Sequence, residues 1–325
     1  MDKIKITVLC MLLLAGMPVW SQPAPPAMDD VFLGDPTIVY ENGVYYMSGT
    51  NDLGHSADFP FYASNDLLIW RSLPSPLTVR SNSWGTYGLW APQFYHLDNH
   101  WLMLYTANEQ IAVAESACLN TSFTQTVPHA LDISEKNIDP YLFKDDDGKY
   151  YLYHVRFNDG NYLWCGEFDI STMSLVSGTL SQCFDISQPW ERTDALPRAT
   201  VMEGPSVIKI DKKYYMFYSC NHFLSPDYAM GYAVADSPQG PWRKSADNPL
   251  LCTASCGEPG DGHGDVFKAA DGKLYYVYHV HYSSTQARPR RTRIVELEKE
   301  LLPNGEYKFH IDYSRIIHPQ LLMQP

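Results

Sequence analysis

The sequence has few basic residues for its length, and this shortage limits its possible partners. It contains 24 Lys and Arg against 37 Asp and Glu, which gives a formal net charge of -13. A protein that binds nucleic acid needs a basic face to meet the phosphate backbone. We therefore expect no nucleic-acid partner, and a neutral ligand is easier to reconcile with this charge.

Long apolar runs are absent apart from one near the N-terminus. Residues 6–17 are apolar, Lys3 and Lys5 precede them, and Val19 and Ser21 are small enough for a cleavage site. The run is shorter than the roughly 18 to 20 residues that span a bilayer, and its flanks are typical of a secretory signal. We predict a signal peptide over residues 1–21, a secreted or periplasmic protein, and no membrane insertion.

Cysteine is scarce and follows no complete metal-binding pattern. Six Cys residues follow the predicted signal peptide, and the spacing of Cys252 and Cys256 suggests a zinc site. No second Cys or His pair completes that site, so a disulfide or free buried thiols are the preferred interpretations. The sequence does not indicate which cysteines would pair.

Aromatic and turn-forming residues are abundant. The chain has 14% aromatic residues, with 23 Tyr, 23 Pro and 20 Gly. This composition favours many short strands separated by turns over long helices. We predict an all-β protein in which residues 22–32 form a Pro-rich leader and residues 33–325 form a single domain.

One pattern recurs five times along residues 33–325: a turn containing Gly, Asn or Lys, followed by an aromatic-rich strand. The copies lie roughly 50 to 65 residues apart, a spacing close to the longer propeller repeats, and each follows a shorter apolar strand. Two such strands around a tight turn predict a β-hairpin, and five copies predict a five-bladed β-propeller. The turns with their second strands are residues 42–46, 98–102, 147–151, 211–215 and 271–276, and the first strands are residues 37–40, 93–97, 141–144, 206–210 and 266–268.

The residues that open the first strands are predicted to meet. Counting back ten or eleven residues from the second-strand aromatics reaches Asp35, Trp90, Asp139, Glu203 and Gly264, and His263 lies beside the last of these. Equivalent positions of a propeller are related by its pseudo-rotation axis, so these residues should gather at one end of the central channel.

Three carboxylates in one pocket can hydrolyse a glycosidic bond. One protonates the departing oxygen while another activates water or attacks directly, and a third raises the pKa of the acid by like-charge repulsion. Asp35 and Asp139 each precede a proline, so either one alone is better explained as a turn residue. Their recurrence together with Glu203, whose residue type is poor in turns, favours the catalytic interpretation.

These motifs closely resemble those of the family 43 glycoside hydrolases. The resemblance covers essentially the whole mature chain, through residues 34–36, 90–92, 138–140, 203–205 and 262–264. It implies a five-bladed propeller that cleaves α-L-arabinofuranosides or β-D-xylosides with inversion. It further implies that Asp35 is the general base, Glu203 the general acid, and Asp139 the residue that tunes the pKa of the acid and orients it.

The same resemblance suggests four further residues, each with an ordinary structural alternative. Trp90 would border the sugar pocket unless it only packs within its blade. Arg288 or Arg290 would reach the sugar hydroxyls, while surface charge is the simpler interpretation of the arginines that follow. His263 would lie near a structural calcium ion, although a lone histidine is more often an ordinary core residue. No cofactor is otherwise expected to be required.

The expected substrate is an arabinose- or xylose-containing oligosaccharide or polysaccharide, with α-L-arabinofuranosidase activity preferred. An exo-β-1,4-xylosidase with the same three acids and a non-catalytic carbohydrate-binding propeller are the alternatives. A retaining enzyme with Asp35 as nucleophile is a third. An inverting enzyme would hold the carboxyl groups of Asp35 and Glu203 about 6.5 to 9.5 Å apart, and a retaining one about 5 to 5.5 Å apart.

Overall fold

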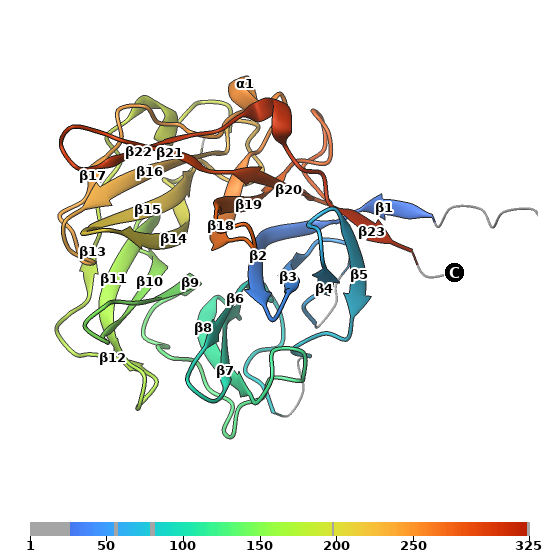
Figure 1. Cartoon of the computed structure of the whole chain (residues 1–325). Coiled ribbons are helices and arrows are strands. Elements are labelled where there is room, and N and C mark those ends of the chain that lie inside the picture. Colours follow the sequence, from blue (N-terminus) through green and yellow to red (C-terminus); the bar gives the residue numbers. More distant parts are fainter. Residues whose placement is uncertain (1–26, 55–57, 79–81, 197, 324–325) are drawn as a thin grey trace, which may run out of the picture.

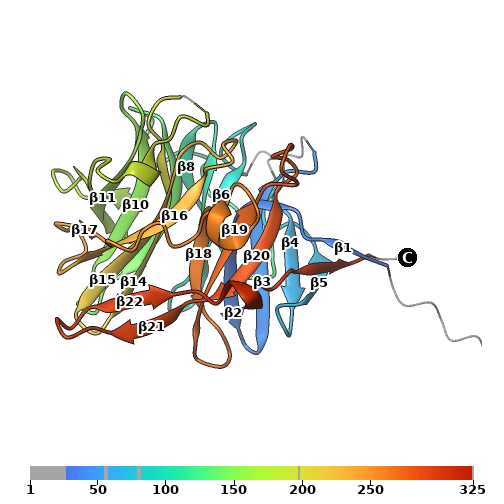
Figure 2. The same ribbon diagram turned by 90° about the horizontal axis from the view of Figure 1, so that it is seen from above.

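The computed structural model describes residues 27–54, 58–78, 82–196 and 198–323. Within them five β-sheets surround a common axis and form a five-bladed β-propeller, which confirms the predicted fold class (Figure 1). In the view turned by 90°, the sheets stand side by side across the thickness of the molecule (Figure 2). The predicted signal peptide lies outside the described residues and stays a prediction.

The blades follow one another along the chain, and each begins with its innermost strand. Blade 1 contains β2 (Leu33–Glu41), β3 (Val44–Asn51), β4 (Phe61–Ser64) and β5 (Ile69–Leu73). Blade 2 contains β6 (Trp90–His96), β7 (Trp101–Ala107) and β8 (Gln110–Ser116). Blade 3 contains β9 (Asn137–Lys144), β10 (Tyr150–Phe157), β11 (Asn161–Asp169), β12 (Ser174–Leu175) and β13 (Ser181–Gln182).

The last two blades repeat this plan. Blade 4 contains β14 (Met202–Ile210), β15 (Lys213–Cys220), β16 (Ala229–Ala235) and β17 (Arg243–Lys244). Blade 5 contains β18 (Gly262–Lys268), β19 (Leu274–Val280) and β20 (Arg291–Glu296). The helix α1 (Thr253–Cys256) precedes blade 5. A separate hairpin, β21 (Glu298–Leu301) with β22 (Tyr307–His310), follows blade 5. Two single-turn 3₁₀ helices span Pro189–Glu191 and Tyr313–Arg315.

The first two strands of every blade form the hairpin that the sequence predicts. In blade 1 the turn is Asn42–Gly43, and both residues have positive φ, 51° and 86°. This is the conformation of the tight turns whose twist matches that of paired strands, and Asn and Gly adopt it at little cost. The observed first strands begin three or four residues earlier than predicted, so that Asp35, Asp139 and Glu203 lie inside strands.

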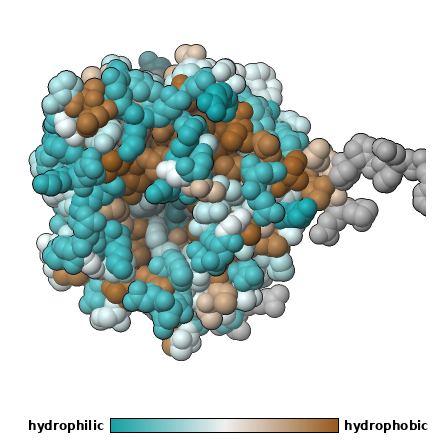
Figure 3. All heavy atoms as spheres, in the orientation of Figure 1, coloured by the Kyte–Doolittle hydropathy of each residue, from teal (hydrophilic) through white to brown (hydrophobic). Residues whose placement is uncertain are grey.

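The hydrophobic core is divided into five clusters, each lying between two successive blades. Aromatic and aliphatic side chains from facing sheets pack together, as Phe61 of blade 1 does with Phe94 of blade 2 at 5.8 Å between ring centres. Another cluster joins Leu33 and Ile38 of blade 1 to Phe267 and Val277 of blade 5. Because every interface between neighbours is filled in this way, the ring is closed by packing. The molecule is hollowed near the centre of the face seen in Figure 3.

Both ends of the described chain join blade 1. Strand β23 (Gln320–Leu322) pairs in parallel with β5, and β1 (Met28–Asp30) pairs antiparallel with β23 (Figure 1). Part of the segment expected as a leader therefore forms a strand. No helix among the described residues is long and apolar enough to span a membrane.

Candidate active site

Each innermost strand contains a β-bulge near its start. The ladder between first and second strands shifts register once in every blade, and one residue at each shift has positive φ, between 40° and 63°. Bulges re-aim side chains and recur beside active sites. The residues at the five bulges are Asp35, Ala91, Asp139, Gly204 and His263.

The bulge turns the backbone N–H of that residue toward a side chain from the preceding blade. In four of the five bulges, the acceptor is a side chain on the second strand of that blade; in the fifth, Asp139 accepts from Gly204. The four other bonds are Asp35 N–H to His279 Nδ1, Ala91 N–H to Thr50 Oγ1, Asp139 N–H to Thr106 Oγ1 and His263 N–H to Ser219 Oγ. A chain of hydrogen bonds between blades therefore fixes the strand entrances around the channel.

The register of the site differs by one residue from the register that the sequence spacing predicts. Trp90 and Glu203 are not equivalent to Asp35 and Asp139, because each immediately precedes the bulge residue of its blade. Counting from the second-strand aromatics cannot detect this shift, because the count crosses a turn whose length differs between blades: five residues separate Lys144 from its partner Tyr150, but only four separate Lys209 from Tyr214. Glu203 therefore lies on the innermost strand of blade 4, next to the strand of Asp139 in blade 3, but one position earlier relative to the bulge.

The predicted site residues share one pocket. Its volume is about 600 Å³, counting the space at its open mouth, which is within the usual range for small-molecule sites. The pocket is lined by all seven residues that the sequence predicts, namely Asp35, Trp90, Asp139, Glu203, His263, Arg288 and Arg290. Ile138, Asn161, His222 and Phe223 complete the lining and were not predicted.

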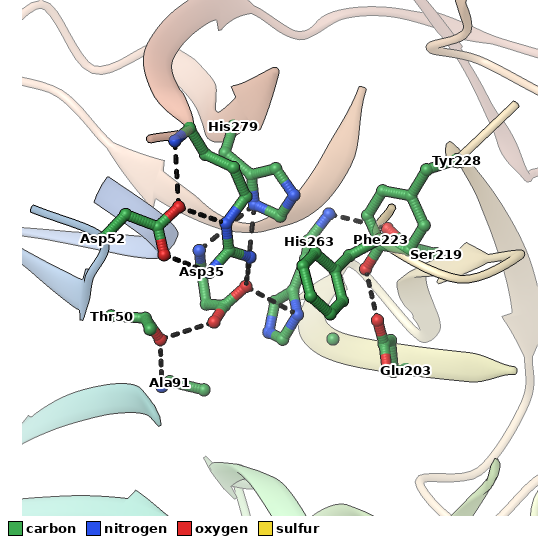
Figure 4. A network of polar contacts seen from close by, with 12 residues as sticks. Asp35, Thr50, Asp52, Ala91, Glu203, Ser219, Phe223, Tyr228, His263 and His279 are labelled. Atoms are coloured by element: carbon green, nitrogen blue, oxygen red, sulfur yellow. Dashed lines mark hydrogen bonds and ion pairs between the residues drawn. The ribbon is translucent and has the colours of Figure 1, made fainter. Parts of the chain in front are cut away.

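Asp35 is buried and surrounded by groups that stabilise its charge (Figure 4). Arg290 Nη1 donates to its Oδ1 at 2.8 Å, His263 Nδ1 lies 3.2 Å from the same oxygen, and Thr50 Oγ1 donates to Oδ2. Burial alone would raise the pKa of Asp35, but the charge of Arg290, the two nearby histidines and the Thr50 hydrogen bond together hold it well below its usual value. Asp35 is therefore ionised at neutral pH.

Arg290 is held in place from its other side. Asp52 accepts hydrogen bonds from Nε and Nη2 of the guanidinium, at 2.8 and 3.1 Å, and from the backbone N–H of Arg290. The guanidinium also lies over the ring of Phe223 and against the backbone of Gly34, where a Cβ atom would come within 1.8 Å of Nη2. Gly34 thus leaves the space that lets this cation reach Asp35.

Glu203 has the opposite electrostatic environment. It is buried, and Tyr228 donates a hydrogen bond to its Oε1 at 2.8 Å. Burial raises the pKa of Glu203 to about 7, with a further rise from the charge of Asp35, while the Tyr228 hydrogen bond and Arg290 act in the lowering direction. A carboxyl group with this pKa is substantially protonated at neutral pH and can donate a proton.

Asp139 resembles Glu203 rather than Asp35 in its electrostatic environment. Its Oδ2 accepts from the backbone N–H of Gly204 at 3.3 Å and lies 3.8 Å from His263 Nδ1. Burial raises the pKa of Asp139 well above its usual value, and the charges of Glu203 and Asp35 raise it further. Because Asp139 and Glu203 repel each other when both are ionised, the two titrate as a pair. The tuning role of Asp139 stays a prediction.

His263 lines the pocket as predicted, but the side chains around it do not form a metal cage. Its Nδ1 faces Asp35, and the described residues contain no group of three or more His, Cys, Asp or Glu side chains that could hold a metal ion. Calcium prefers six to eight oxygen ligands. A calcium ion here would therefore need water for most of its coordination, and the chemistry below uses none.

All six described cysteines are free.

Besides the four unpredicted lining residues, three residues that contact the site were missed by the sequence analysis. Thr50 is the last but one residue of β3 in blade 1 and Asp52 directly follows that strand, and nothing in the local pattern distinguishes either from an ordinary strand-end residue. Tyr228 precedes β16 in a chain that has 23 tyrosines, so its residue type carries little information. The geometry now joins an ionised carboxylate to a protonated carboxyl group in one pocket, which is the pairing that glycoside hydrolysis requires.

Comparisons with known proteins agree with this chemistry. A structure of an endo-1,4-beta-xylanase from Bacteroides thetaiotaomicron is 36% identical, with a TM-score of 0.83 over 92% of this chain and 100% of that one. A beta-D-galactofuranosidase from Aspergillus niger is 25% identical over 81% of this chain and 78% of its own length. An extracellular exo-alpha-(1->5)-L-arabinofuranosidase from Streptomyces avermitilis is 26% identical over 63% of this chain and 47% of its own length. Residues 29–300 match the profile of glycosyl hydrolases family 43, and the chain belongs to that family of glycoside hydrolases.

Proposed function

We propose that this enzyme releases a pentose from arabinose- or xylose-containing polysaccharides or oligosaccharides with inversion of configuration. The observation that carries the proposal is the contrast between two buried carboxyl groups in one pocket. The pKa of Asp35 is held low by Arg290 and its other partners despite burial, while burial raises that of Glu203 to about 7. Such a separation of pKa values assigns the base to Asp35 and the acid to Glu203.

The reaction follows from these protonation states. Asp35 takes a proton from a water molecule, and the water oxygen attacks the anomeric carbon from the side opposite the leaving group. The glycosidic C–O bond breaks as Glu203 gives its proton to the departing oxygen. Asp35 and Glu203 lie on blades 1 and 4, which are not neighbours in the ring, and this placement favours a gap wide enough for the water. Proton exchange with solvent then restores both groups.

Binding of a neutral sugar is assigned to the remaining lining residues. Trp90 is partly buried and offers an indole face at the pocket, where it can stack on a sugar ring. Arg288 lies over the ring of Phe223, 4.9 Å from its centre, and its Nε lies 3.6 Å from Asp52 Oδ1. Because 52% of its side chain is exposed, its terminal N–H groups are available to hydroxyl groups. Arg290 already donates hydrogen bonds to Asp35 and Asp52, so we assign sugar contact first to Arg288.

The preferred substrate is an α-L-arabinofuranoside. Two relatives, the Aspergillus galactofuranosidase and the Streptomyces arabinofuranosidase, are named for five-membered sugar rings. The Bacteroides relative, which is more similar in sequence, is named for xylan, so a β-xyloside is the second candidate. Both substrates would use the same three acids.

A panel of aryl pentosides tests the proposal. The enzyme should release the aryl group from an α-L-arabinofuranoside or a β-D-xyloside, and Asp35→Asn serves as the matched control because a base is needed whatever group departs. Proton NMR during early turnover of an oligosaccharide should show the inverted anomer first. Initial release of the retained anomer would make Asp35 a nucleophile, and sugar binding without any release would indicate a non-catalytic propeller.

A further inference from the structure

A second ring of polar side chains lies two residues beyond the bulges. The innermost strands place equivalent residues at these positions, and several of them contact one another between neighbouring blades around the channel. Thr37 Oγ1 of blade 1, for example, lies 3.1 Å from Gln93 Oε1 of blade 2. The five residues of this ring are Thr37, Gln93, Tyr141, Ser206 and Asp265.

Asp265 is the centre of these contacts. Thr37 Oγ1 donates to its Oδ2 at 2.7 Å, and Ser206 Oγ donates to its Oδ1 at 2.8 Å. All three residues are buried, with exposed fractions of 6% for Asp265, 1% for Thr37 and 0% for Ser206. Each oxygen of one carboxylate is thus committed to a different strand.

The two strands are those that carry the proposed base and acid. Thr37 follows Asp35 by two residues on β2 of blade 1, and Ser206 follows Glu203 by three residues on β14 of blade 4. Asp265 reaches both from β18 of blade 5, which stands between those blades and closes the ring. The strands of the two catalytic carboxyl groups are therefore linked by hydrogen bonds to a single side chain, that of Asp265.

We propose that Asp265 is a positioning residue that sets the separation between the carboxyl groups of Asp35 and Glu203. The inference rests on the proposed function, because that separation matters only if the two groups act on the same bond. Within the described residues no Lys, Arg or His forms an ion pair with Asp265. A buried carboxylate without such a partner is costly to retain for packing alone.

The chemistry of a carboxylate suits this task. Its two oxygens diverge in a fixed plane, and both accept, so two hydroxyl donors on different strands can be held at a set spacing. An amide offers only one acceptor oxygen and would hold only one donor in this way. Ser206 Oγ also accepts from the backbone N–H of Val266 at 3.0 Å, which orients its own proton toward Asp265.

The test removes the bridge from each side, and the substitutions at Ser206 and Thr37 do so without changing charge. Ser206→Ala and Thr37→Val each delete one hydroxyl, Thr37→Ser keeps it, and Asp265→Asn replaces one acceptor by a donor. Ser48→Ala is the matched control, since Ser48 is fully buried in β3 and loses a 2.8 Å hydrogen bond to the Pro60 carbonyl within its own blade. Each variant is assayed for kcat and KM on two aryl pentosides, one with a poor and one with a good leaving group.

Misplacing the acid relative to the base should lower kcat with little change in KM. A displacement of about 1 Å can cost up to about 100-fold in rate, and the loss should be larger with the poor leaving group, which needs the proton from Glu203. Thr37→Ser should recover most of the activity lost in Thr37→Val. Equal fractional losses on both substrates, or losses no greater than in Ser48→Ala, would overturn the proposal.

Crystal structures of Ser206→Ala, Thr37→Val, Ser48→Ala and the wild type provide a measurement that needs no activity. The distance between the Asp35 and Glu203 carboxyl groups should change in both variants and stay constant in Ser48→Ala. An unchanged distance in both variants refutes the positioning role even if the enzyme is active. A wild type that cleaves no pentoside refutes the proposed function instead, and the distance measurement still decides whether Asp265 sets the spacing.

Discussion

Glu203→Gln should make folding stability less sensitive to pH while removing activity. Burial, as the largest cause, raises the pKa of Glu203 from 4.5 to about 7 in the folded protein. A raised carboxyl pKa costs no stability below the unfolded value, where both states are protonated, and costs it fully above the folded value, where both are ionised. Because one pKa unit corresponds to about 1.4 kcal/mol, the wild type should lose roughly 3 kcal/mol between pH 4.5 and 7 from this group.

The glutamine variant cannot ionise and should escape that loss. The same replacement also removes the Glu203 charge that raises the pKa of Asp139. Asp139 then ionises more easily in the folded variant, which further reduces the loss of stability with rising pH. Urea unfolding of both proteins at several pH values gives the difference in unfolding free energy. The difference below pH 4.5 reports only the cost of the amide itself and serves as the baseline. It should rise by up to about 3 kcal/mol toward pH 7.5. A flat difference across this range would show that Glu203 is not held protonated, and would remove the basis for naming it the acid.

Three other expectations concern catalysis. Asp35→Asn and Glu203→Gln should each lower kcat about 10²- to 10⁴-fold, and a good leaving group should partly rescue only Glu203→Gln, because a base is needed whatever departs. Tyr228→Phe removes a hydrogen bond that lowers the pKa of Glu203, so the basic limb of the pH–rate profile should move to higher pH; movement to lower pH would contradict the assignment. Asp139→Asn tests the tuning role: removal of a like charge would move the same limb to lower pH, whereas an unmoved limb would show that the raised pKa of Asp139 keeps it protonated while Glu203 titrates.

The sequence predicts the repeating part of this fold well because hairpins depend on local chemistry. The Asn42–Gly43 turn and its four counterparts mark every first pair of strands, and the five copies fix the number of blades. The outer strands are harder to predict, since β12, β13 and β17 have two residues each and carry no alternating pattern. They form because a neighbouring strand offers a free edge, which is a property of the assembled sheet.

The site divides along the same line. Asp35, Asp139 and Glu203 could be found from sequence because they recur near repeat positions with distinctive residue types. The groups that set their charges could not, since Asp52 and Tyr228 come from connections between strands. The one-residue shift of Glu203 was also hidden, because the turn between the first two strands is one residue shorter in blade 4 than in blade 3, and only the strand pairing reveals this.

Asp139 shows how one irregularity in the ring can supply both geometry and electrostatics. In the other four blades, the second-strand residue that pairs just before the bulge is Thr50, Thr106, Ser219 or His279, and each accepts the N–H of the next bulge. Blade 3 has Val155 there, which has no acceptor, so Asp139 itself accepts from Gly204, the residue after Glu203. Because Val155 has no acceptor, the Gly204 N–H bonds to Asp139, and this hydrogen bond links the carboxyl group of Asp139 to the strand of Glu203. Asparagine at position 139 keeps a carbonyl acceptor for that N–H, so Asp139→Asn removes the charge while Asp139→Ala removes the hydrogen bond as well. Comparing their pH–rate profiles separates tuning of the acid from its orientation.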